Sequence, residues 1–356
     1  MSVPVIAFFN NKGGVGKTSM VYHLSWMFAD QGMRVIAADL DPQCNLTAAF
    51  LDDDRLEEAM RSDSDTLTVF RAIQPLKSGT GDIADAQVLS GPSLAEPFKR
   101  ASGDISDAHV EEITDRLGLV LGDMALSTFE DQLSEVWPKC LDRDDRAFRV
   151  ISSFWRILQR AADQHRAEVI IVDLGPNLGA INRAALISSD FVVVPLSPDL
   201  FSLQGLRNLG PALRRWREEW NERLGKNPVQ DLILPAANIK PIGYMVLRHS
   251  IRLDRPVKAF DRWLARIPST YTESVLQEQP DASVTIDTDP NCIAKLKDYR
   301  SLMPLAQEAR KPMFFLKPAD GALGAHTYAV TGAYGDFRKV AEIIASRAGI
   351  RTQPGT

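Results

Sequence analysis

The sequence predicts an α/β protein with a doubly wound, mostly parallel sheet of about seven strands flanked by helices. Three observations lead to this prediction. The unbroken apolar run Val3–Phe9 has the character of a strand buried on both faces. A glycine-rich loop and a segment with helical apolar spacing follow this run directly. Further apolar runs then alternate with helical patterns along most of the chain, as they do in sheets that bind ligands at the carboxyl ends of their strands.

The individual elements follow from local pattern. The expected strands, in chain order, are Val3–Phe9, Arg34–Leu40, Leu117–Leu121, Glu168–Leu174, Phe191–Leu196, Pro241–Leu247 and Met313–Leu316. The clearest expected helices are Thr18–Gln31, Phe148–His165 and Phe337–Arg347. Gly32 stands where a glycine commonly ends a helix.

Length and composition indicate one large domain, residues 1–356, because 356 residues with 45% hydrophobic content can bury a sizeable core. The net charge of -5 gives no whole-molecule attraction to nucleic acid or to anionic lipid. Three widely spaced cysteines fit neither a disulfide framework nor a zinc site, so a reducing cytoplasm is expected. No apolar stretch approaches the length of a membrane span. We therefore expect a cytoplasmic protein without membrane association.

Charge is distributed unevenly along the chain. Residues 52–115 hold 15 Asp or Glu and 6 Lys or Arg, and we interpret them as a partly helical, acidic insertion at the sheet edge. A surface excursion without function is the alternative for this segment. Residues 207–266 hold 13 Lys or Arg and 6 Asp or Glu, a net of +7, and form a basic region. A nucleic-acid partner would have to be met by such a local patch.

The strongest chemical signal is the loop from Lys12 to Thr18, Lys-Gly-Gly-Val-Gly-Lys-Thr. A phosphate chain needs backbone N–H groups converging on its oxygens, and glycines allow that approach ahead of a helix N-terminus whose dipole favours anions. Lys17 is expected to reach the β- and γ-phosphates, and Thr18 to place its hydroxyl on Mg²⁺. The ordinary pattern has glycine where this chain has Asn11, and Lys12 is additional. The residues expected to contact nucleotide are Lys12, Gly13, Gly14, Val15, Gly16, Lys17, Thr18 and Ser19.

Three aspartates end predicted strands. Asp173 closes a buried strand at the ligand edge of the sheet, where Mg²⁺ needs oxygen ligands. Asp39 lies at the end of another such strand and Asp41 just after it, at the same edge, where an attacking water has to be positioned in line with phosphorus. Turn formation and helix capping are alternative roles for these two, and for Asp39 that alternative is equally weighted.

Together, Lys12–Thr18, the phrase Asp39-Leu-Asp-Pro-Gln-Cys-Asn45 and Ile170–Pro176 resemble the ParA/MinD superfamily of deviant Walker A ATPases, the ParA branch most. The resemblance implies ATP and Mg²⁺ as ligands and a homodimer that forms on ATP. In that dimer Lys12 reaches the partner's nucleotide, and Lys12, Lys17 and Asp41 serve ATP hydrolysis. Thr18 and Asp173 are then implied on Mg²⁺, with Asp41 orienting the attacking water.

This chain departs from the ParA pattern at two places. Cys44 replaces a glycine in the phrase that begins at Asp39. Gly175-Pro176 replaces a pair of prolines after Asp173, which matches the Walker B aspartate of the family. A looser loop after Asp173 is one reading of the second departure. For the adenine, Pro195–Asp199 is a candidate loop, with a plain strand-to-helix connection as the alternative.

The resemblance implies a partition ATPase that positions DNA cargo through nonspecific DNA binding, near the nucleoid and with a small adaptor or activator protein. The DNA contacts we expect are Arg207, Arg214, Arg215, Arg217, Arg223 and Lys226, with a solvated helix as the alternative. A regulatory or defence-associated ATPase acting on a protein partner is the second hypothesis. A MinD-like membrane ATPase is the third, weakened because the polar end of the chain lacks an amphipathic helix. Iron–sulfur reductases share the lysine-rich loop, but they need paired cysteine ligands that this chain lacks.

Overall fold

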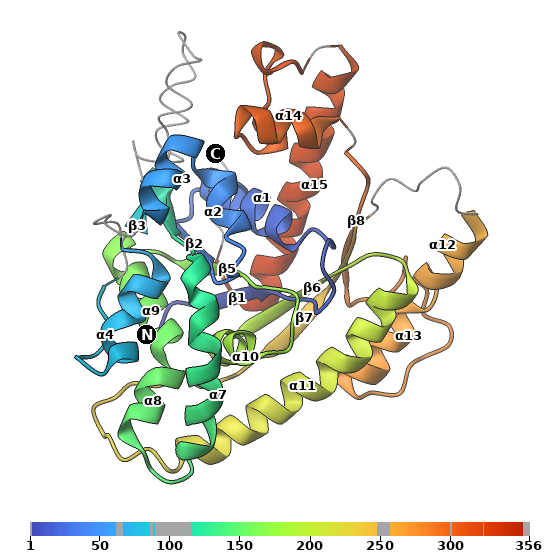
Figure 1. The fold of residues 1–356 in the computed structure, drawn as a ribbon. Helices are drawn as coiled ribbons and strands as arrows, with labels where there is room; N and C mark the ends of the chain where they lie inside the picture. The colour runs from blue at the N-terminus through green and yellow to red at the C-terminus, as the bar shows by residue number, and fades with distance from the viewer. Residues whose placement is uncertain are drawn as a thin grey trace.

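The computed structural model describes residues 2–61, 67–85, 88–89, 115–247, 257–299, 301–322 and 324–351. At its centre is an eight-stranded sheet with the order β3-β4-β2-β5-β1-β6-β7-β8 (Figure 1). The strands are β1 Val5–Phe8, β2 Val35–Asp39, β3 Val88–Leu89, β4 Leu117–Val120, β5 Val169–Asp173, β6 Phe191–Leu196, β7 Lys240–Leu247 and β8 Cys292–Leu296. All neighbouring strands are parallel except β3, which pairs antiparallel with β4 at one edge. The predicted doubly wound α/β fold is confirmed.

Helices cover both faces of the sheet (Figure 1). One face carries α4 Val69–Ser78, η1 Met124–Phe129, α7 Glu130–Lys139, α8 Asp145–Ile151, α9 Ser153–His165, α10 Ala180–Ile187, α11 Leu200–Leu224, α12 Val257–Leu264, α13 Ile267–Tyr271 and η2 Thr272–Leu276. The other carries α1 Lys17–Asp30, α2 Asn45–Phe50, α3 Asp53–Met60, α14 Leu302–Ala309, η3 Met313–Phe315, η4 Pro318–Asp320 and α15 Ala325–Ala348. Two hydrophobic cores, one on each face, explain why the central strands are apolar on both faces up to the aspartates that end β2 and β5.

Strand register decides where the carboxylates lie. β5 pairs with both β1 and β2, so Asp173 is level with Phe8 on one side and with Asp39 on the other. Because all three strands are parallel, their carboxyl ends meet at one edge, directly below the loop that leads into α1.

The structure corrects three expectations about elements. Met313–Leu316 is not a strand; Met313–Phe315 is the 3₁₀ helix η3, whose Met313 N–H donates to His23 Nε2 at 3.1 Å. Strands β3 and β8 were not predicted. The expected helix Phe148–His165 is two helices, because the chain turns at Ser152 (φ -86°, ψ 0°).

The described part of residues 52–115 includes α3, α4 and β3, and the remainder (62–66, 86–87, 90–114) lies outside the described residues.

An ion-pair cluster attaches this segment to α8 and α9. Asp82 accepts from Arg149 Nη1 at 2.7 Å and from Arg156 Nη1 and Nη2 at 2.8 and 2.7 Å. Although partial burial acts in the opposite direction, hydrogen bonds from Arg156 and Arg149 hold the pKa of the Asp82 carboxyl well below its usual range.

We predict that Asp82→Asn lowers the free energy of unfolding at pH 7 by about 1 to 2 kcal/mol, because it leaves the guanidinium of Arg156 without its counter-charge. The folded pKa of Asp82 is depressed, so its contribution is present above the unfolded pKa and is lost as pH falls through the folded value. Urea unfolding of both proteins at pH 7 and below pH 4 measures this. A wild-type advantage that grows on acidification would contradict the assignment.

Candidate nucleotide site

The loop between β1 and α1 has the backbone that a phosphate cradle requires. Gly14 (φ 70°) and Gly16 (φ 79°) both have left-handed backbone, which other residues adopt only under strain. Gly16 is the N-cap of α1 and supplies no side-chain cap. The first N–H groups of α1 and the positive end of its dipole are therefore available to an anion at this loop.

Lys17 places a buried cation at this loop. Its side chain is 7% exposed, and Nζ donates to the carbonyl oxygens of Asn10 at 3.2 Å and Lys12 at 3.3 Å. Burial lowers the pKa of Lys17, and the nearby carboxylates of Asp173 and Asp41 act in the opposite direction. The ammonium thus lies between the loop backbone and the carboxylates at the sheet edge.

Lys12 is arranged differently from Lys17. Its ammonium forms an ion pair with Asp199, the N-cap of α11. Asp199 also accepts from the Ser202 N–H at 2.9 Å, so one carboxylate caps α11 and binds Lys12. The neighbouring Asn11 fits because α11 has Gly205 here, where a Cβ would lie 2.8 Å from Asn11 Oδ1.

Asp39 has a structural role in the loop after β2. It is fully buried and accepts from Thr47 N at 2.8 Å, from Thr47 Oγ1 at 2.7 Å and from Asp41 N at 3.2 Å. Burial raises the pKa of the Asp39 carboxyl, and its hydrogen bonds with Thr47 act in the opposite direction. Because these contacts occupy both oxygens, Asp39 shapes the loop that presents Asp41.

Asp41 faces the cleft above the glycine loop. Its Oδ1 accepts from the Gln43 N–H at 3.0 Å, which fixes the carboxylate at the start of the turn. The backbone of Gly175 passes so close that a Cβ there would lie 3.1 Å from Asp41 Oδ1. The loops that follow β2 and β5 therefore meet at Asp41.

Asp173 is a buried carboxylate beside Thr18. Within the part of the chain that the structure describes, neither of its oxygens has a hydrogen-bond partner, although the Thr18 hydroxyl is near enough to oppose the shift in its pKa. Burial, followed by the charge of Asp39, raises the pKa of Asp173. A buried carboxylate with two unused oxygens beside a hydroxyl fits a hard divalent cation, which prefers oxygen ligands. Thr18 and Asp173 are thus suited to hold Mg²⁺.

A cleft of about 660 Å³ lies over the loop. Seven of the predicted site residues line it: Gly13, Gly14, Gly16, Lys17, Thr18, Ser19 and Asp41. Val15 is fully buried below it, and Lys12 and Asp173 are outside its lining. The opposite wall was missed from the sequence and consists of Met303, Ala306, Gln307, Arg310 and Lys311. The phrase Glu308–Pro312, which resembles the family's C-terminal part, was the available signal. Pro195–Asp199, the candidate adenine loop, does not line the cleft.

Cys44 stands where the ParA pattern that this sequence resembles has glycine. It is the N-cap of α2 with φ 54°, a left-handed conformation that glycine adopts without strain. Its thiol is buried, and this burial raises the pKa of Cys44 well above the usual range. The side chain is therefore an inert part of the turn.

The basic region contributes both surface and core residues. Arg207, Arg215 and Lys226 are exposed on or just after α11, and Arg214 and Arg217 are half-buried. Arg223 is 5% exposed, with its guanidinium 4.1 Å from the ring centroid of Trp137, so it packs within the fold and we leave it out of a DNA surface. Trp216 and Trp220 of α11 are buried in the core. Residues 248–256 of this region lie outside the described residues.

A glycine loop between a buried strand and a helix, with aspartates at the carboxyl ends of adjacent parallel strands, defines the P-loop NTPase class. The AAA_31 family, an AAA domain, matches residues 3–226, and the chain belongs to this family. It is a P-loop ATPase of the ParA/MinD type.

Curated relatives match part of the chain. The virulence plasmid ParA family protein pGP5-D of Chlamydia psittaci is 28% identical, over 57% of this chain and 61% of its own length. The sporulation initiation inhibitor protein Soj of Bacillus subtilis is 26% identical, over 62% of this chain and 68% of its own length. An uncharacterised Methanocaldococcus jannaschii protein, MJECL24, is 26% identical, and the chain spans 62% of it. The chain thus spans about three-fifths of pGP5-D and MJECL24.

Solved structures with the same fold match nearly the whole chain. Protein DIP2308 of Corynebacterium diphtheriae has a TM-score of 0.66 at 22% identity, covering 97% of this chain and 98% of that one. An ATP complex of Cyanothece McdA has a TM-score of 0.56 at 15% identity, covering 99% of both chains. A putative plasmid partition protein of Borrelia burgdorferi bound to AMPPNP has a TM-score of 0.51 at 15% identity, covering 98% and 100%. At these identities the likeness is one of fold.

Among the described residues, no helix combines the length and the apolar character needed to cross a bilayer.

Proposed function

We propose that this protein binds ATP with Mg²⁺, dimerises on ATP, hydrolyses it to ADP and phosphate, and positions DNA cargo by binding DNA without sequence preference. The observation that carries the catalytic part is the grouping of a buried lysine and an oriented aspartate that line one cleft, Lys17 and Asp41, with a buried aspartate that has unused oxygens and acts on the same lysine, Asp173.

The residues divide the chemistry between them. The glycine loop and the N-terminus of α1 bind the phosphates, and Lys17 places its charge beside the β- and γ-phosphates. Asp41 accepts a hydrogen bond from the attacking water and aligns it with the γ-phosphate. Bound Mg²⁺, held by Thr18 and Asp173, would neutralise charge that develops on the phosphate oxygens.

The base and ribose lie against α14 in this proposal. Met303, Ala306 and Gln307 form the wall of the cleft opposite α2, and Ser19 is in contact with Met303, with its Oγ 3.9 Å from Met303 Sδ. This part of the wall, which continues into Arg310 and Lys311, is apolar with one amide and suits a purine ring, which needs a flat contact and few polar partners.

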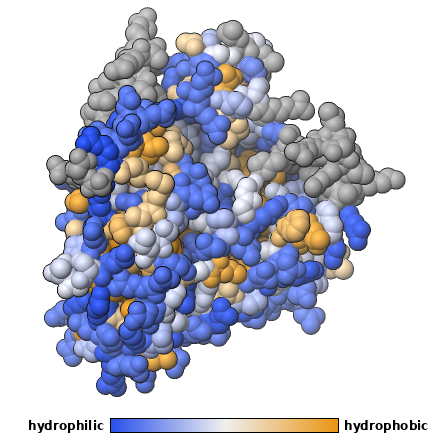
Figure 2. All heavy atoms as spheres, viewed as in Figure 1, coloured by the Kyte–Doolittle hydropathy of each residue, from blue (hydrophilic) through white to orange (hydrophobic). Residues whose placement is uncertain are grey.

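A second copy of the chain completes the dimer. Lys12 is held in its own loop through its backbone, which bonds to Asn10 Oδ1 and to Lys17 Nζ, whereas its ammonium pairs with Asp199 and can change partner if Asp199 releases it. Apolar side chains are exposed nearby, with Leu200 at 48% and Phe201 at 71%. The face seen in Figure 2 is mostly hydrophilic, with separate hydrophobic patches. Exposed apolar residues beside the loop are suited to an interface formed only when nucleotide is bound.

We expect Lys12→Ala to abolish the ATP-dependent dimer and to leave nucleotide binding largely intact, because Lys12 acts across the interface. Light scattering with a non-hydrolysable ATP analogue measures the mass of each protein. Lys139→Ala, at the far end of α7, is the control and should dimerise as wild type does. A dimer of Lys12→Ala at the nucleotide concentration that suffices for wild type would contradict this role.

DNA binding is proposed from both the relatives and the surface. The pGP5-D and Soj proteins are relatives of this chain, and the Borrelia structure is named as a putative plasmid partition protein. The arginines of α11 other than the buried Arg223 supply the phosphate contacts, and their acidic neighbours neutralise them only partly, since Arg215 Nε lies 3.9 Å from Glu219 Oε1. Dimerisation would double the number of such contacts and make binding depend on ATP.

The double variant Arg214→Glu with Arg215→Glu should weaken ATP-dependent binding to duplex DNA of any sequence. The slope of log affinity against log salt should become shallower by about one for each phosphate that no longer meets an arginine. Mobility shift with ATP, ADP and no nucleotide measures this, with Arg338→Glu and Lys339→Glu on α15 as an equally charged control pair. Absence of nucleotide-dependent binding by the wild type at low salt would favour the regulator of a protein partner over the partition ATPase.

The partner and the place in the cell follow from the same proposal. A partition ATPase that cycles between monomer and dimer needs a small adaptor or activator protein to link it to cargo, and it acts in the cytoplasm on the nucleoid. A pull-down with ATP and Mg²⁺, compared with ADP, would identify this partner.

A further inference from the structure

The loop that follows Asp173, residues 174–179, is held by one buried amide. Asn182, on the first turn of α10, is 1% exposed. Its Nδ2 donates to the carbonyl oxygens of Gly175 at 2.9 Å and Asn177 at 2.7 Å, and lies 3.0 Å from Asn177 Oδ1. Asn177 Oδ1 also accepts from the Gly179 N–H at 2.9 Å. These bonds fix the backbone of the loop at its beginning, middle and end.

A carboxylate from another helix fixes the junction between this loop and α10. Glu130, the first residue of α7, accepts from the backbone N–H groups of Ala180 and Ile181 through its two oxygens, the second at 2.8 Å. The fit explains Gly179, where a Cβ would lie 2.5 Å from Glu130 Oε1. Glu130 therefore caps the N-terminus of α10, although it lies 50 residues away in the sequence. The cap is a tertiary contact between two helices and does not come from the residues next to α10.

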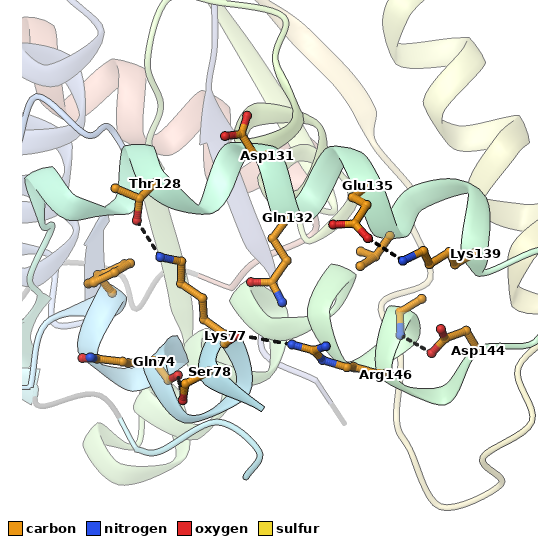
Figure 3. Close-up of a pocket in the computed structure, with 13 residues that line it drawn as sticks. Gln74, Lys77, Ser78, Thr128, Asp131, Gln132, Glu135, Lys139, Asp144 and Arg146 are labelled. Carbon is orange, nitrogen blue, oxygen red and sulfur yellow. Dashed lines mark hydrogen bonds and ion pairs between the residues drawn. The ribbon is translucent and has the colours of Figure 1, made fainter. Parts of the chain in front are cut away.

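Other residues of this region line the groove between α4 and α7, and Glu130 is not among them (Figure 3). Thr128 and Gln132 line that groove, and Lys77 of α4 donates to Thr128 Oγ1 at 3.0 Å. Arg183 of α10 connects α10 to α7. Its guanidinium donates to the carbonyl of Leu133 at 3.2 Å and lies 4.3 Å from the ring centroid of Trp137, and both partners belong to α7. Helix α7 is thus a fixed support for α10.

The held loop contacts both halves of the nucleotide site. Gly175 lies against the carboxylate of Asp41, and Pro176 lies 3.8 Å from the Cβ position of Gly13 in the phosphate loop. A shift of the loop would therefore move the surroundings of Asp41 and of the cradle together. Only one proline stiffens this loop, so its placement depends on the hydrogen bonds from Asn182 and Glu130.

We infer that Asn182 and Glu130 are positioning residues for ATP hydrolysis: they hold the loop after Asp173 against Asp41 and against the phosphate cradle. The inference rests on the proposed ATPase function. The sequence has Gly175-Pro176 where the ParA pattern has two prolines, which suggested a looser loop after Asp173. We infer a held loop instead, because the buried amide of Asn182 and the remote carboxylate of Glu130 supply the rigidity. Neither residue lines the cleft, so each acts on the attacking water only through the loop. For the same reason their effect on ATP binding should be weak.

The test compares Asn182→Ala, Asn182→Asp and Glu130→Gln in the full chain. We expect kcat to fall between about 10- and 100-fold, since small misplacements of reacting groups have effects of this size, while ATP affinity stays within about threefold. Asn182→Asp should be the most severe, because it replaces the two donor hydrogens with a charge that repels the loop carbonyls. Gln132→Ala, whose side chain lines the groove instead, is the matched control on α7.

A second measurement does not depend on hydrolysis. Hydrogen–deuterium exchange at the amides of residues 174–181 should become at least about tenfold faster in the variants, with the amides of β1 unchanged. If the wild-type protein did not hydrolyse ATP, the proposed function would be wrong. If hydrogen–deuterium exchange at residues 174–181 were the same in the variants as in wild type, the positioning role would be wrong, whatever the outcome for hydrolysis. Equal loss of kcat, ATP affinity and β1 protection would identify Asn182 and Glu130 as general fold residues and also overturn the inference.

Discussion

Replacing Asp41 with alanine is expected to lower kcat for ATP hydrolysis by about 10²- to 10³-fold while the ATP-bound dimer persists. The side chain lines the cleft, and it is oriented by the Gln43 N–H and by the close approach of Gly175. Alignment of water matters in the transition state more than in the ground state, so the loss appears in kcat and little in ATP affinity.

Two measurements separate this role from loss of structure. Phosphate release at saturating ATP gives kcat, and light scattering with ATP gives the mass of the Asp41→Ala protein, which should remain that of a dimer for longer than in wild type. Asp231→Ala changes an exposed aspartate remote from the cleft and should leave both values unchanged. Hydrolysis by Asp41→Ala at the wild-type rate would remove Asp41 from the reaction.

The phosphate loop and the aspartates were predictable because they depend on local sequence and on one rule of sheets. A buried apolar run followed by glycines and a helix places Lys17 and Thr18 without any long-range information. Parallel pairing then brings Asp39 level with Asp173, as the carboxyl ends of parallel strands share an edge. The sequence alone could not decide that Asp39 bonds to Thr47 and Asp41 does not, because both aspartates lie at the carboxyl end of the same strand.

The parts that could not be predicted depend on contacts between distant residues. Lys12 meets Asp199 across 187 positions, and Glu130 meets Ala180 across 50. The apolar segment at Met313 has the composition of a strand, but it packs as a 3₁₀ helix because His23 of α1 binds its backbone N–H. The wall of the cleft formed by α14 depends on the same packing. Local propensity carries no signal for such tertiary choices.

Replacing Asp173 with asparagine should weaken Mg²⁺-dependent nucleotide binding by about 10- to 100-fold and at the same time stabilise the protein without ligand. The two effects have one cause. Asp173 is a fully buried carboxylate whose oxygens have no protein hydrogen-bond partner among the described residues, and the charge of Lys17 offsets only part of the cost of burying it. Asparagine keeps the shape and removes the charge, and the cation loses its ligand.

Nucleotide affinity titrated against Mg²⁺ measures the first effect, and thermal unfolding without nucleotide or Mg²⁺ measures the second. Thr18→Ala is the comparison, since it removes the other proposed ligand without removing a buried charge, so it should lose Mg²⁺-dependent binding and gain no stability. If Asp173→Asn were less stable than wild type while keeping its Mg²⁺ dependence, Asp173 would be a structural carboxylate. Its unused oxygens beside Thr18 and Lys17 favour the opposite result, because a fold selected for stability alone would pair that carboxylate or replace it.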